Sequence, residues 1–218
     1  MALRLVCIAC AALGYCFGLF QSAFIIGKII GKDIRKEGSG NLGATNMMRT
    51  AGLIPGIITF VLDLAKVFAA IFLSRYIVIG LLGLSIDKRA LLLYTGLGVV
   101  LGHIFPFYLK FRGGKGVAAT AAIYICIWDW KIAVIGIAAF VIAVLIKGYV
   151  SLGSLLFTSL CYIAFIIFMF TGLIYVMPAW RADCIILMGI LVALIFIEHR
   201  ENIKRLAAGT EKKFSIKK

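Results

Sequence analysis

Long apolar stretches alternate with short polar segments along the whole chain. A helix of about 20 apolar residues is long enough to cross the hydrocarbon core of a bilayer. The stretches of that kind are residues 4–27, 55–79, 90–105, 151–177 and 183–199. The pattern predicts an all-α polytopic membrane protein, in which residues 1–218 form a single integral membrane domain.

The apolar stretch 116–147 has two interpretations. Two apolar runs are separated by Trp128, Asp129 and Trp130, which is typical of an aromatic anchor at the membrane interface. Two short helices give seven spans, whereas one long helix gives six. With seven spans and the N-terminus outside, the loops at 28–53, 106–116 and 147 share one face with the C-terminal tail. That face then holds 16 of the 23 basic residues, those of the tail included. Because basic loops are retained in the cytoplasm, we predict seven transmembrane helices with the C-terminus cytoplasmic.

Composition narrows the class of protein further. The chain is 63% hydrophobic, its mean hydropathy is +1.10 and its formal net charge is +14, which is far more apolar than a soluble domain. The positive-inside rule and affinity for anionic membrane lipids account for most of this charge, and a site for phosphorylated substrates is the further possibility. The basic residues are scattered among short loops, which argues against nucleic acid as a partner.

The first polar segment, GSGNLGATNMMR, covers residues 38–49 and precedes the second predicted span. Glycines at 38, 40 and 43 permit positive φ and a close approach of the backbone, and successive N–H groups in such loops bind anions. The planar guanidinium of Arg49 suits phosphate. A flexible turn explains the glycines, but it does not explain the interleaved polar residues Ser39, Asn41, Thr45 and Asn46.

The second polar segment, GHIFPFYLKFRGGKGVAAT, covers residues 102–120. Its Gly113-Gly114-Lys115-Gly116 run precedes a predicted helix, so we expect free N–H groups and the positive end of the helix dipole to face an anion. It is not a Walker A loop, because Gly116 stands where Ser or Thr should follow the lysine. The basic residues of this segment have a second interpretation as interface anchors.

The third polar segment, EHRENIKRLAAGTE, covers residues 198–211 and is predicted to extend the last span as a helix. At 100° per residue, His199 and Asn202 lie on the same face. A lone histidine on a helix surface is usually not catalytic. Here it accompanies an asparagine on the same predicted membrane side as two candidate phosphate loops, and this placement favours a functional role.

Two charged residues, Asp63 and Lys66, lie within the second predicted span. An ion pair three residues apart along one helix is the simpler explanation, and a charge inside a span is also a functional candidate. The two interpretations remain open. No Cys, His and carboxylate residues have metal-ligand spacing, so we expect neither a metal nor a cofactor.

The three polar segments, in this order, resemble those of the bacterial acyl-phosphate:glycerol-3-phosphate acyltransferases, the PlsY family. The matching motifs extend from about residue 38 to residue 211. Members of this family transfer an acyl group from acyl phosphate to the 1-hydroxyl of glycerol 3-phosphate, giving lysophosphatidic acid and phosphate. The resemblance implies a bacterial cell (inner) membrane enzyme with its active site at the cytoplasmic face, and it implies glycerol 3-phosphate, acyl phosphate and membrane lipids as partners.

The resemblance also assigns residues. It places Ser39, Lys115, His199 and Asn202 in the catalytic group, with Arg49 beside glycerol 3-phosphate. The wider substrate-binding set consists of Ser39, Asn41, Gly43, Ala44, Thr45, Asn46, Arg49, Gly113, Gly114, Lys115, His199 and Asn202. Gly43, Ala44 and Thr45 offer backbone groups to acyl phosphate. Many acyltransferases have an Asp at the fifth position after the His, but here that position after His199 is Lys204, so positioning of substrate is favoured over general-base catalysis. Glu211 is expected to be structural.

Two other classes compete with the enzyme. A glycerol-phosphate or anion transporter would also use basic loops and broken helices, but it should show inverted repeats and a site near the midplane. The sequence shows no repeat, and its polar segments gather on one predicted face. A lipid-binding scaffold would not need the specific Ser, Asn, Arg and His set.

Overall fold

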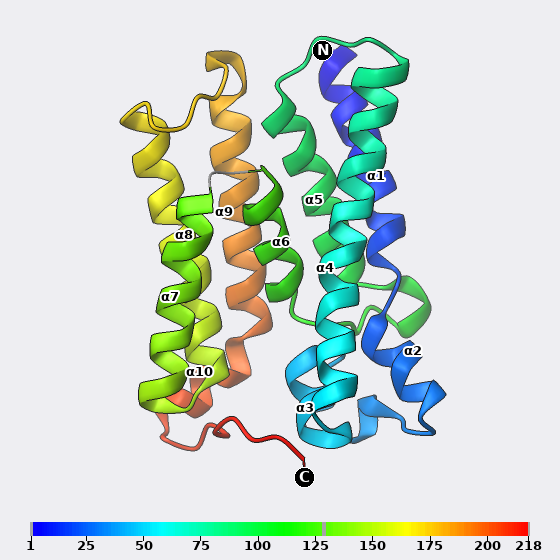
Figure 1. Ribbon diagram of the computed structural model, residues 1–218, viewed down its shortest axis with the longest axis vertical. Helices are drawn as coiled ribbons and strands as arrows, with labels where there is room; N and C mark the ends of the chain where they lie inside the picture. Colours follow the sequence, from blue (N-terminus) through cyan, green and yellow to red (C-terminus); the bar gives the residue numbers. More distant parts are fainter. Residues whose placement is uncertain (1, 128–129, 218) are drawn as a thin grey trace.

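The computed structural model describes residues 2–127 and 130–217, and these residues form a helical bundle without strands (Figure 1). The α-helices are α1 Ala2–Gly18, α2 Ser22–Ile29, α3 Ala44–Ala51, α4 Leu53–Arg75, α5 Lys88–Ile104, α6 Val117–Ile127, α7 Trp130–Lys147, α8 Val150–Phe170, α9 Arg181–Glu198 and α10 Arg200–Ala207. Short turns of other helix types are η1 Ile34–Lys36, η2 Tyr76–Leu81, η3 Phe107–Leu109 and η4 Pro178–Trp180.

The described residues contain six helices long and apolar enough to cross a membrane, together with a shorter apolar helix at Val117–Cys126. The division of 116–147 into two helices is confirmed, because α6 ends at Ile127 and α7 begins at Trp130. Trp128 and Asp129, predicted as part of the interface anchor, lie outside the described residues. At about 1.5 Å per residue, α6 rises only about 16 Å, so it covers part of the roughly 30 Å hydrocarbon core.

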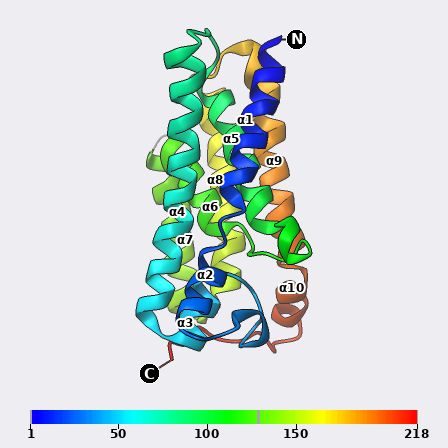
Figure 2. The same cartoon turned by 90° about the vertical axis from the view of Figure 1, so that its right-hand side faces the viewer.

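The first span differs from the expectation of one continuous helix over residues 4–27. It is broken between α1 and α2 at Leu19, Phe20 and Gln21 (Figure 2). Gln21 is fully buried at the break, where its Nε2 donates to the carbonyl oxygens of Gly18, Gly102 and His103. A buried amide needs such partners, and here it finds them on α1 and on the end of α5.

Helices α1 and α5 approach each other closely through glycines. Gly14 and Gly18 on α1 and Gly98 and Gly102 on α5 lie at this contact, and a Cβ built on any of these four glycines would collide with the backbone of the opposite helix. Small residues four apart let membrane helices approach closely. This close packing fixes the position of the C-terminal end of α5 relative to α1. The Gly113–Lys115 segment comes after that end in the chain and folds back on it.

Large apolar side chains cover the outside of the bundle, as a lipid-facing surface requires. Phe72 and Leu145, for example, are each 79% exposed. The interior holds a cluster of fully buried side chains from α5, α6, α8 and α9, including Leu91, Tyr124 and Phe165. The arrangement places apolar surface where a bilayer would surround it.

The predicted gathering of polar segments at one end of the bundle is confirmed. Beyond α10 the tail crosses this end, where Phe214 N–H donates to Gly148 O (2.7 Å) and Lys217 N–H donates to Met48 O (3.0 Å). The N-terminus lies at the opposite end from α3, α10 and the C-terminus (Figure 1). This separation agrees with an odd number of passes, and the assignment of the α3–α10 end to the cytoplasm remains a prediction.

Candidate active site

The segment before α3 is held in shape by Asn46, which is 2% exposed. Its Oδ1 accepts from Ser39 N–H (2.9 Å), and its Nδ2 donates to the carbonyl oxygens of Glu37 (3.1 Å) and Ile34 (3.4 Å). The amide therefore supports the loop, and the contact of Asn46 with substrate stays a prediction. Gly38 and Gly40 have φ of 63° and 71°, as predicted for this loop.

Gly43 differs from the expectation of positive φ. Its φ is −140°, which is extended backbone, and it is the N-cap residue of α3. The first N–H groups of a helix have no intrahelical acceptor. Within the part of the chain that the structure describes, the N–H groups of Ala44 and Thr45 have no hydrogen-bond acceptor. They are free donors at the positive end of the helix dipole.

Arg49 lies on the last turn of α3 and is half-buried. Among residues 2–127 and 130–217, no acidic side chain pairs with its guanidinium. Since partly buried cations are usually paired, a free guanidinium here is a candidate anion ligand. Ser39 and Asn41 lie on the preceding loop, where Ser39 is exposed and its Oγ accepts from Asn41 N–H at 3.5 Å.

The Gly113–Gly114 segment folds back on the end of α5. Gly113 N–H donates to Ile104 O (3.0 Å), and Gly114 N–H donates to His103 O (3.1 Å). These two N–H groups are therefore not free to bind an anion, and the place of Gly113 and Gly114 in the substrate site stays a prediction. The two glycines serve close packing instead, because a Cβ on Gly113 would collide with His103 O, and a Cβ on Gly114 would collide with the His103 ring.

Lys115 and Asn202 come together although they are far apart in the sequence. Lys115 Nζ donates to Asn202 Oδ1, and Asn202 Nδ2 donates to Glu211 Oε1 at 2.6 Å. Glu211 also accepts from Ser151 Oγ (2.9 Å) and from Arg205 Nε (2.6 Å). The carboxylate thus fixes the amide of Asn202 so that its oxygen faces the Lys115 ammonium.

His199 lies between α9 and α10 and is 2% exposed. Its Nδ1 is 2.8 Å from Ile195 O. A carbonyl oxygen only accepts, so Nδ1 carries the proton and Nε2 of the neutral ring is an acceptor. Burial, together with the positive charge of Lys115, lowers the pKa of His199 to about 4. The ring is therefore neutral near pH 7, and a backbone carbonyl orients it in place of an aspartate.

The charges of Lys115 and Glu211 are coupled. Burial lowers the pKa of Lys115 to about 8, Glu211 opposes this shift, and the cations Arg205 and Arg49 add to it. Burial acts to raise the pKa of Glu211, but the hydrogen bonds from Asn202, Arg205 and Ser151 outweigh it and the pKa is lowered. Near pH 7 the site therefore holds an ammonium ion and a carboxylate.

The three polar segments meet at one place in the structure. The position of a Cβ on Gly114 lies 2.8 Å from Leu42 O, which brings the second segment against the first. Lys115 joins the second to the third through Asn202, and Arg49 is near enough to influence the pKa of Lys115. In the described ranges, no hydrogen bond or ion pair connects Ser39 or Asn41 to the lysine end of the site.

Sequence reasoning missed residues that organise the site. Glu211, expected only to be structural, holds Asn202, and Ser151 on α8 and Arg205 on α10 hold Glu211. Glu211 is the last residue of the third motif. Its acidic charge close to basic residues was the signal in the sequence that could have indicated its role in the site. Sequence reasoning assigned His103 no role, yet its ring and its carbonyl oxygen support the Gly113–Gly114 segment. No group of His, Cys, Asp or Glu suited to a metal occurs among the described residues.

Comparison with known proteins identifies the class. Residues 8–209 match the family model of glycerol-3-phosphate acyltransferase, a match that begins well before residue 38 and includes most of the first span. A glycerol-3-phosphate acyltransferase of Desulfotalea psychrophila is 37% identical over 94% of this chain and 96% of its own. That of Shouchella clausii is 39% identical over 96% and 97%.

Solved structures agree with this match. The crystal structure of PlsY (YgiH), an integral membrane glycerol 3-phosphate acyltransferase, in its glycerol 3-phosphate form covers 99% of this chain and 96% of its own, with 31% identity and a TM-score of 0.75. Its lysophosphatidic acid form has a TM-score of 0.76 at 31% identity, over 96% of this chain and 95% of its own. The protein is thus an integral membrane acyltransferase, and the chain belongs to the glycerol-3-phosphate acyltransferase family.

Proposed function

We propose that this protein transfers an acyl group from acyl phosphate to the 1-hydroxyl of sn-glycerol 3-phosphate. The products are 1-acyl-sn-glycerol 3-phosphate and inorganic phosphate, and the reaction is the first step of bacterial phospholipid synthesis. The observation that carries the proposal is that Lys115 donates to Asn202 and influences the pKa of His199, while its neighbour Gly114 lies against Leu42 O, just before the free N-terminus of α3. Such a site holds two phosphates, one from water and one on a lipid tail.

Glycerol 3-phosphate is held by cations. Arg49 has no acidic partner among the described residues, and Lys115 has a neutral amide as its hydrogen-bond acceptor. A phosphate dianion supplies the charge that both cations lack, and a guanidinium binds two of its oxygens at once. Hydrogen bonds to charged groups contribute about 1.5–3 kcal/mol each. These two residues therefore give most of the affinity for glycerol 3-phosphate.

Acyl phosphate binds at the N-terminus of α3. The N–H groups of Ala44 and Thr45 are free in the described structure, and the helix dipole adds positive potential there. Gly43 leaves room above these donors, because a Cβ at this position would approach the Asn41 side chain. Ser39, on the loop held by Asn46, supplies a hydroxyl at the edge of the site.

The reaction is a substitution at the acyl carbon. The 1-hydroxyl oxygen forms a bond to the carbonyl carbon, the bond from that carbon to the phosphate oxygen breaks, and the electron pair leaves with phosphate. Negative charge develops on the carbonyl and phosphate oxygens, where preorganised donors stabilise it. Each such donor contributes roughly 2.7–4 kcal/mol in comparable sites. The proton of the hydroxyl ends on the departing phosphate.

His199 positions the hydroxyl. Its Nδ1 proton is donated to Ile195 O, so Nε2 accepts a hydrogen bond from the 1-hydroxyl and aims the oxygen lone pair at the carbonyl. A pKa of about 4 makes this imidazole a weak base, and phosphate is the stronger proton acceptor. Asn202, fixed by Glu211, keeps Lys115 in place.

We place the site at the cytoplasmic face of a bacterial cell membrane. The support is charge: the end of the bundle that carries the three segments holds most of the basic residues of the chain. Glycerol 3-phosphate reaches this end from water, and the acyl donor reaches it within the leaflet. The residues from 1 to 218 act as one enzyme domain.

A two-substrate assay tests the proposal. Purified protein in detergent, supplied with palmitoyl phosphate and glycerol 3-phosphate, should release phosphate and form lysophosphatidic acid in equal amounts. Palmitoyl-CoA with glycerol 3-phosphate serves as the control for the donor and should give no product. Absence of product with palmitoyl phosphate, or product with palmitoyl-CoA alone, would overturn the assignment.

A further inference from the structure

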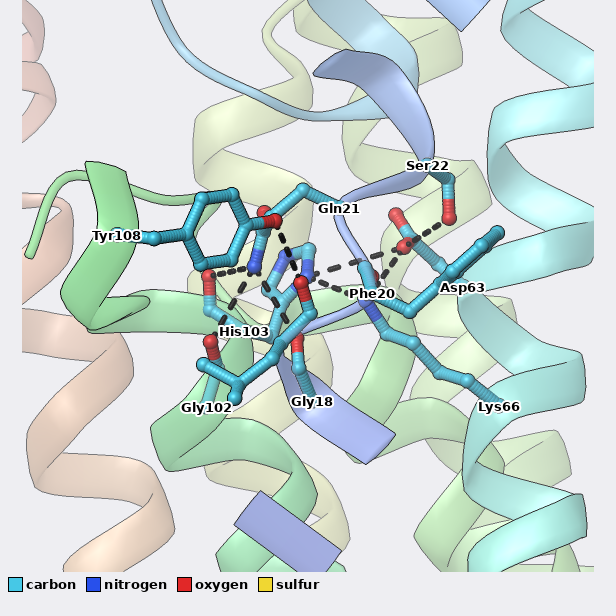
Figure 3. Close-up of polar contacts among 10 residues, drawn as sticks. Gly18, Phe20, Gln21, Ser22, Asp63, Lys66, Gly102, His103 and Tyr108 are labelled. Atoms are coloured by element: carbon cyan, nitrogen blue, oxygen red, sulfur yellow. Dashed lines mark hydrogen bonds and ion pairs between the residues drawn. The ribbon is translucent and has the colours of Figure 1, made fainter. Parts of the chain in front are cut away.

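A second polar cluster lies inside the bundle, at the break between α1 and α2 (Figure 3). Asp63 and Lys66 on α4 form an ion pair of 2.8 Å, and their side chains are only 3% and 4% exposed. Ser22, the first residue of α2, donates its hydroxyl to the Asp63 carboxylate at 2.9 Å. The expected i,i+3 pair is therefore present, and it is tied to the broken first span.

Lys66 has more partners than an ion pair requires. Its ammonium is within hydrogen-bonding distance of Asp63 Oδ1 (2.8 Å), Phe20 O (3.0 Å) and His103 Nδ1 (2.7 Å). An ammonium group has three N–H donors, and here three acceptors from three separate elements take them. Lys66 consequently joins α4, the break in the first span and the end of α5 (Figure 3).

The contact with Lys66 fixes the His103 ring. Because the ammonium donates to Nδ1, the neutral ring carries its proton on Nε2. That Nε2 edge lies against Gly114, where a side chain of any size would collide with it. The carbonyl oxygen of His103 accepts from Gln21 Nε2 (3.0 Å) and from Gly114 N–H (3.1 Å). Both the side chain and the main chain of His103 therefore support the glycine segment.

We infer that the Asp63–Lys66–His103 cluster is the positioning device for Lys115. Gly114 packs against the His103 ring and donates its N–H to the His103 carbonyl oxygen, and Lys115 is the next residue. The orientation of the His103 ring and the position of its carbonyl therefore determine the position of the Lys115 ammonium. Among the described residues, no hydrogen bond or ion pair joins the cluster to Arg49, Lys115, His199 or Asn202, so it acts on Lys115 through Gly114. This inference rests on the proposed function, since Lys115 is the residue that binds glycerol 3-phosphate.

The alternative is that the cluster only stabilises the bundle. An ion pair that merely neutralised two charges would be complete with Asp63 and Lys66, both on α4. One N–H of Lys66 and two of the three hydrogen bonds of Gln21 instead converge on the end of α5, shortly before the loop that returns at Gly113. A charge-free replacement of Asp63 and Lys66 distinguishes the two roles. It should preserve the stability of the bundle, but it should not preserve the position of the Gly113–Lys115 loop.

The test uses the double variant Asp63→Asn/Lys66→Met. It leaves no unpaired charge in the bundle, so its thermal unfolding temperature in detergent should stay near that of the wild type, but the His103 ring loses its donor. We expect kcat/KM for glycerol 3-phosphate to fall by roughly 10- to 100-fold, mainly through KM, with KM for palmitoyl phosphate unchanged. Lys66→Arg, which keeps a cationic donor, should recover part of the loss.

Ser74→Ala is the matched control, because Ser74 is a fully buried polar residue on the same helix whose hydroxyl has no hydrogen-bond partner among the described residues. It should leave both KM values unchanged. An active wild type whose double variant keeps a normal KM for glycerol 3-phosphate would overturn the inference and leave the proposed function standing. Equal losses for both substrates with early unfolding would also overturn it. An inactive wild type would instead overturn the proposed function.

Discussion

The protein contains two lysine–histidine pairs, one in the middle of the bundle and one at its polar end. In the inner pair, the Lys66 ammonium has three protein acceptors, and one of them is the His103 ring. In the outer pair, Lys115 has one amide oxygen as its hydrogen-bond acceptor, and the His199 ring is oriented by the backbone of α9. The residue types are the same, whereas the number of partners differs.

This difference separates support from binding. A polar group whose hydrogen bonds are all satisfied by the protein has nothing left for a ligand, and it fixes its neighbours. A group with spare donors or acceptors is free to bind one. Lys115 keeps N–H donors, and His199 keeps Nε2. The outer pair is therefore assigned to the binding of substrate, and the inner pair is assigned to the positioning of the Gly113–Lys115 loop.

Replacement of His199 should have the largest effect on turnover. His199→Ala removes the acceptor that aims the hydroxyl, and we expect kcat to fall by about 100-fold. His199→Gln retains a side-chain oxygen acceptor and should stay within about tenfold of the wild type. Steady-state kinetics with palmitoyl phosphate and saturating glycerol 3-phosphate measure both values. If Gln is as poor as Ala, His199 removes the proton itself and the positioning role is wrong.

The pH dependence should report Lys115. Its pKa of about 8 means that the ammonium is present below this pH and is lost above it. One unit above the pKa about a tenth of the lysine is charged, so kcat/KM for glycerol 3-phosphate should fall roughly tenfold between pH 7 and pH 9. The profile of Lys115→Ala should lack this fall. An alkaline limb that persists in the variant would assign the titration to another group.

Glu211 should have a smaller effect, because it acts on the site through Asn202. Glu211→Gln keeps one carbonyl acceptor but removes the charge that pairs with Arg205 at 2.6 Å. We expect kcat/KM for glycerol 3-phosphate to fall about tenfold, which corresponds to roughly 1.4 kcal/mol. Lys212→Ala, a change at the next residue, is the matched control and should leave the kinetics unchanged. An unchanged kcat/KM for glycerol 3-phosphate in Glu211→Gln would contradict the proposal that Glu211 holds Asn202 in place.

Much of the fold could be predicted from the sequence because the signals were strong. Apolar length placed the spans, and charge bias separated α6 from α7. The break at Gln21 was not predicted, because the residues around it are apolar and two of the three partners of the amide lie more than 80 positions away along the chain. The glycines four apart in α1 and α5 carried a packing signal that hydropathy does not detect.

The site could be predicted in part. Glycine, asparagine and arginine in one loop indicated a phosphate site, and Arg49 is indeed without an acidic partner among the described residues. Backbone donors were expected at Ala44 and Thr45 and also in the Gly113–Gly114 segment. Tertiary contacts use the N–H groups of Gly113 and Gly114, and sequence does not show which donors such contacts will use. The same limit concealed His103, whose role depends on a lysine 37 positions away.

Binding of glycerol 3-phosphate to the purified protein, measured by isothermal titration calorimetry without acyl donor, tests the central assignment most directly. The wild type should bind one glycerol 3-phosphate per chain. In Arg49→Ala/Lys115→Ala the affinity should fall at least about 100-fold, because two charge-assisted contacts are lost. Arg112→Ala, an exposed cation near the same loop, should bind normally. Unchanged affinity in the double variant would contradict the assignment of the phosphate to this pair of cations.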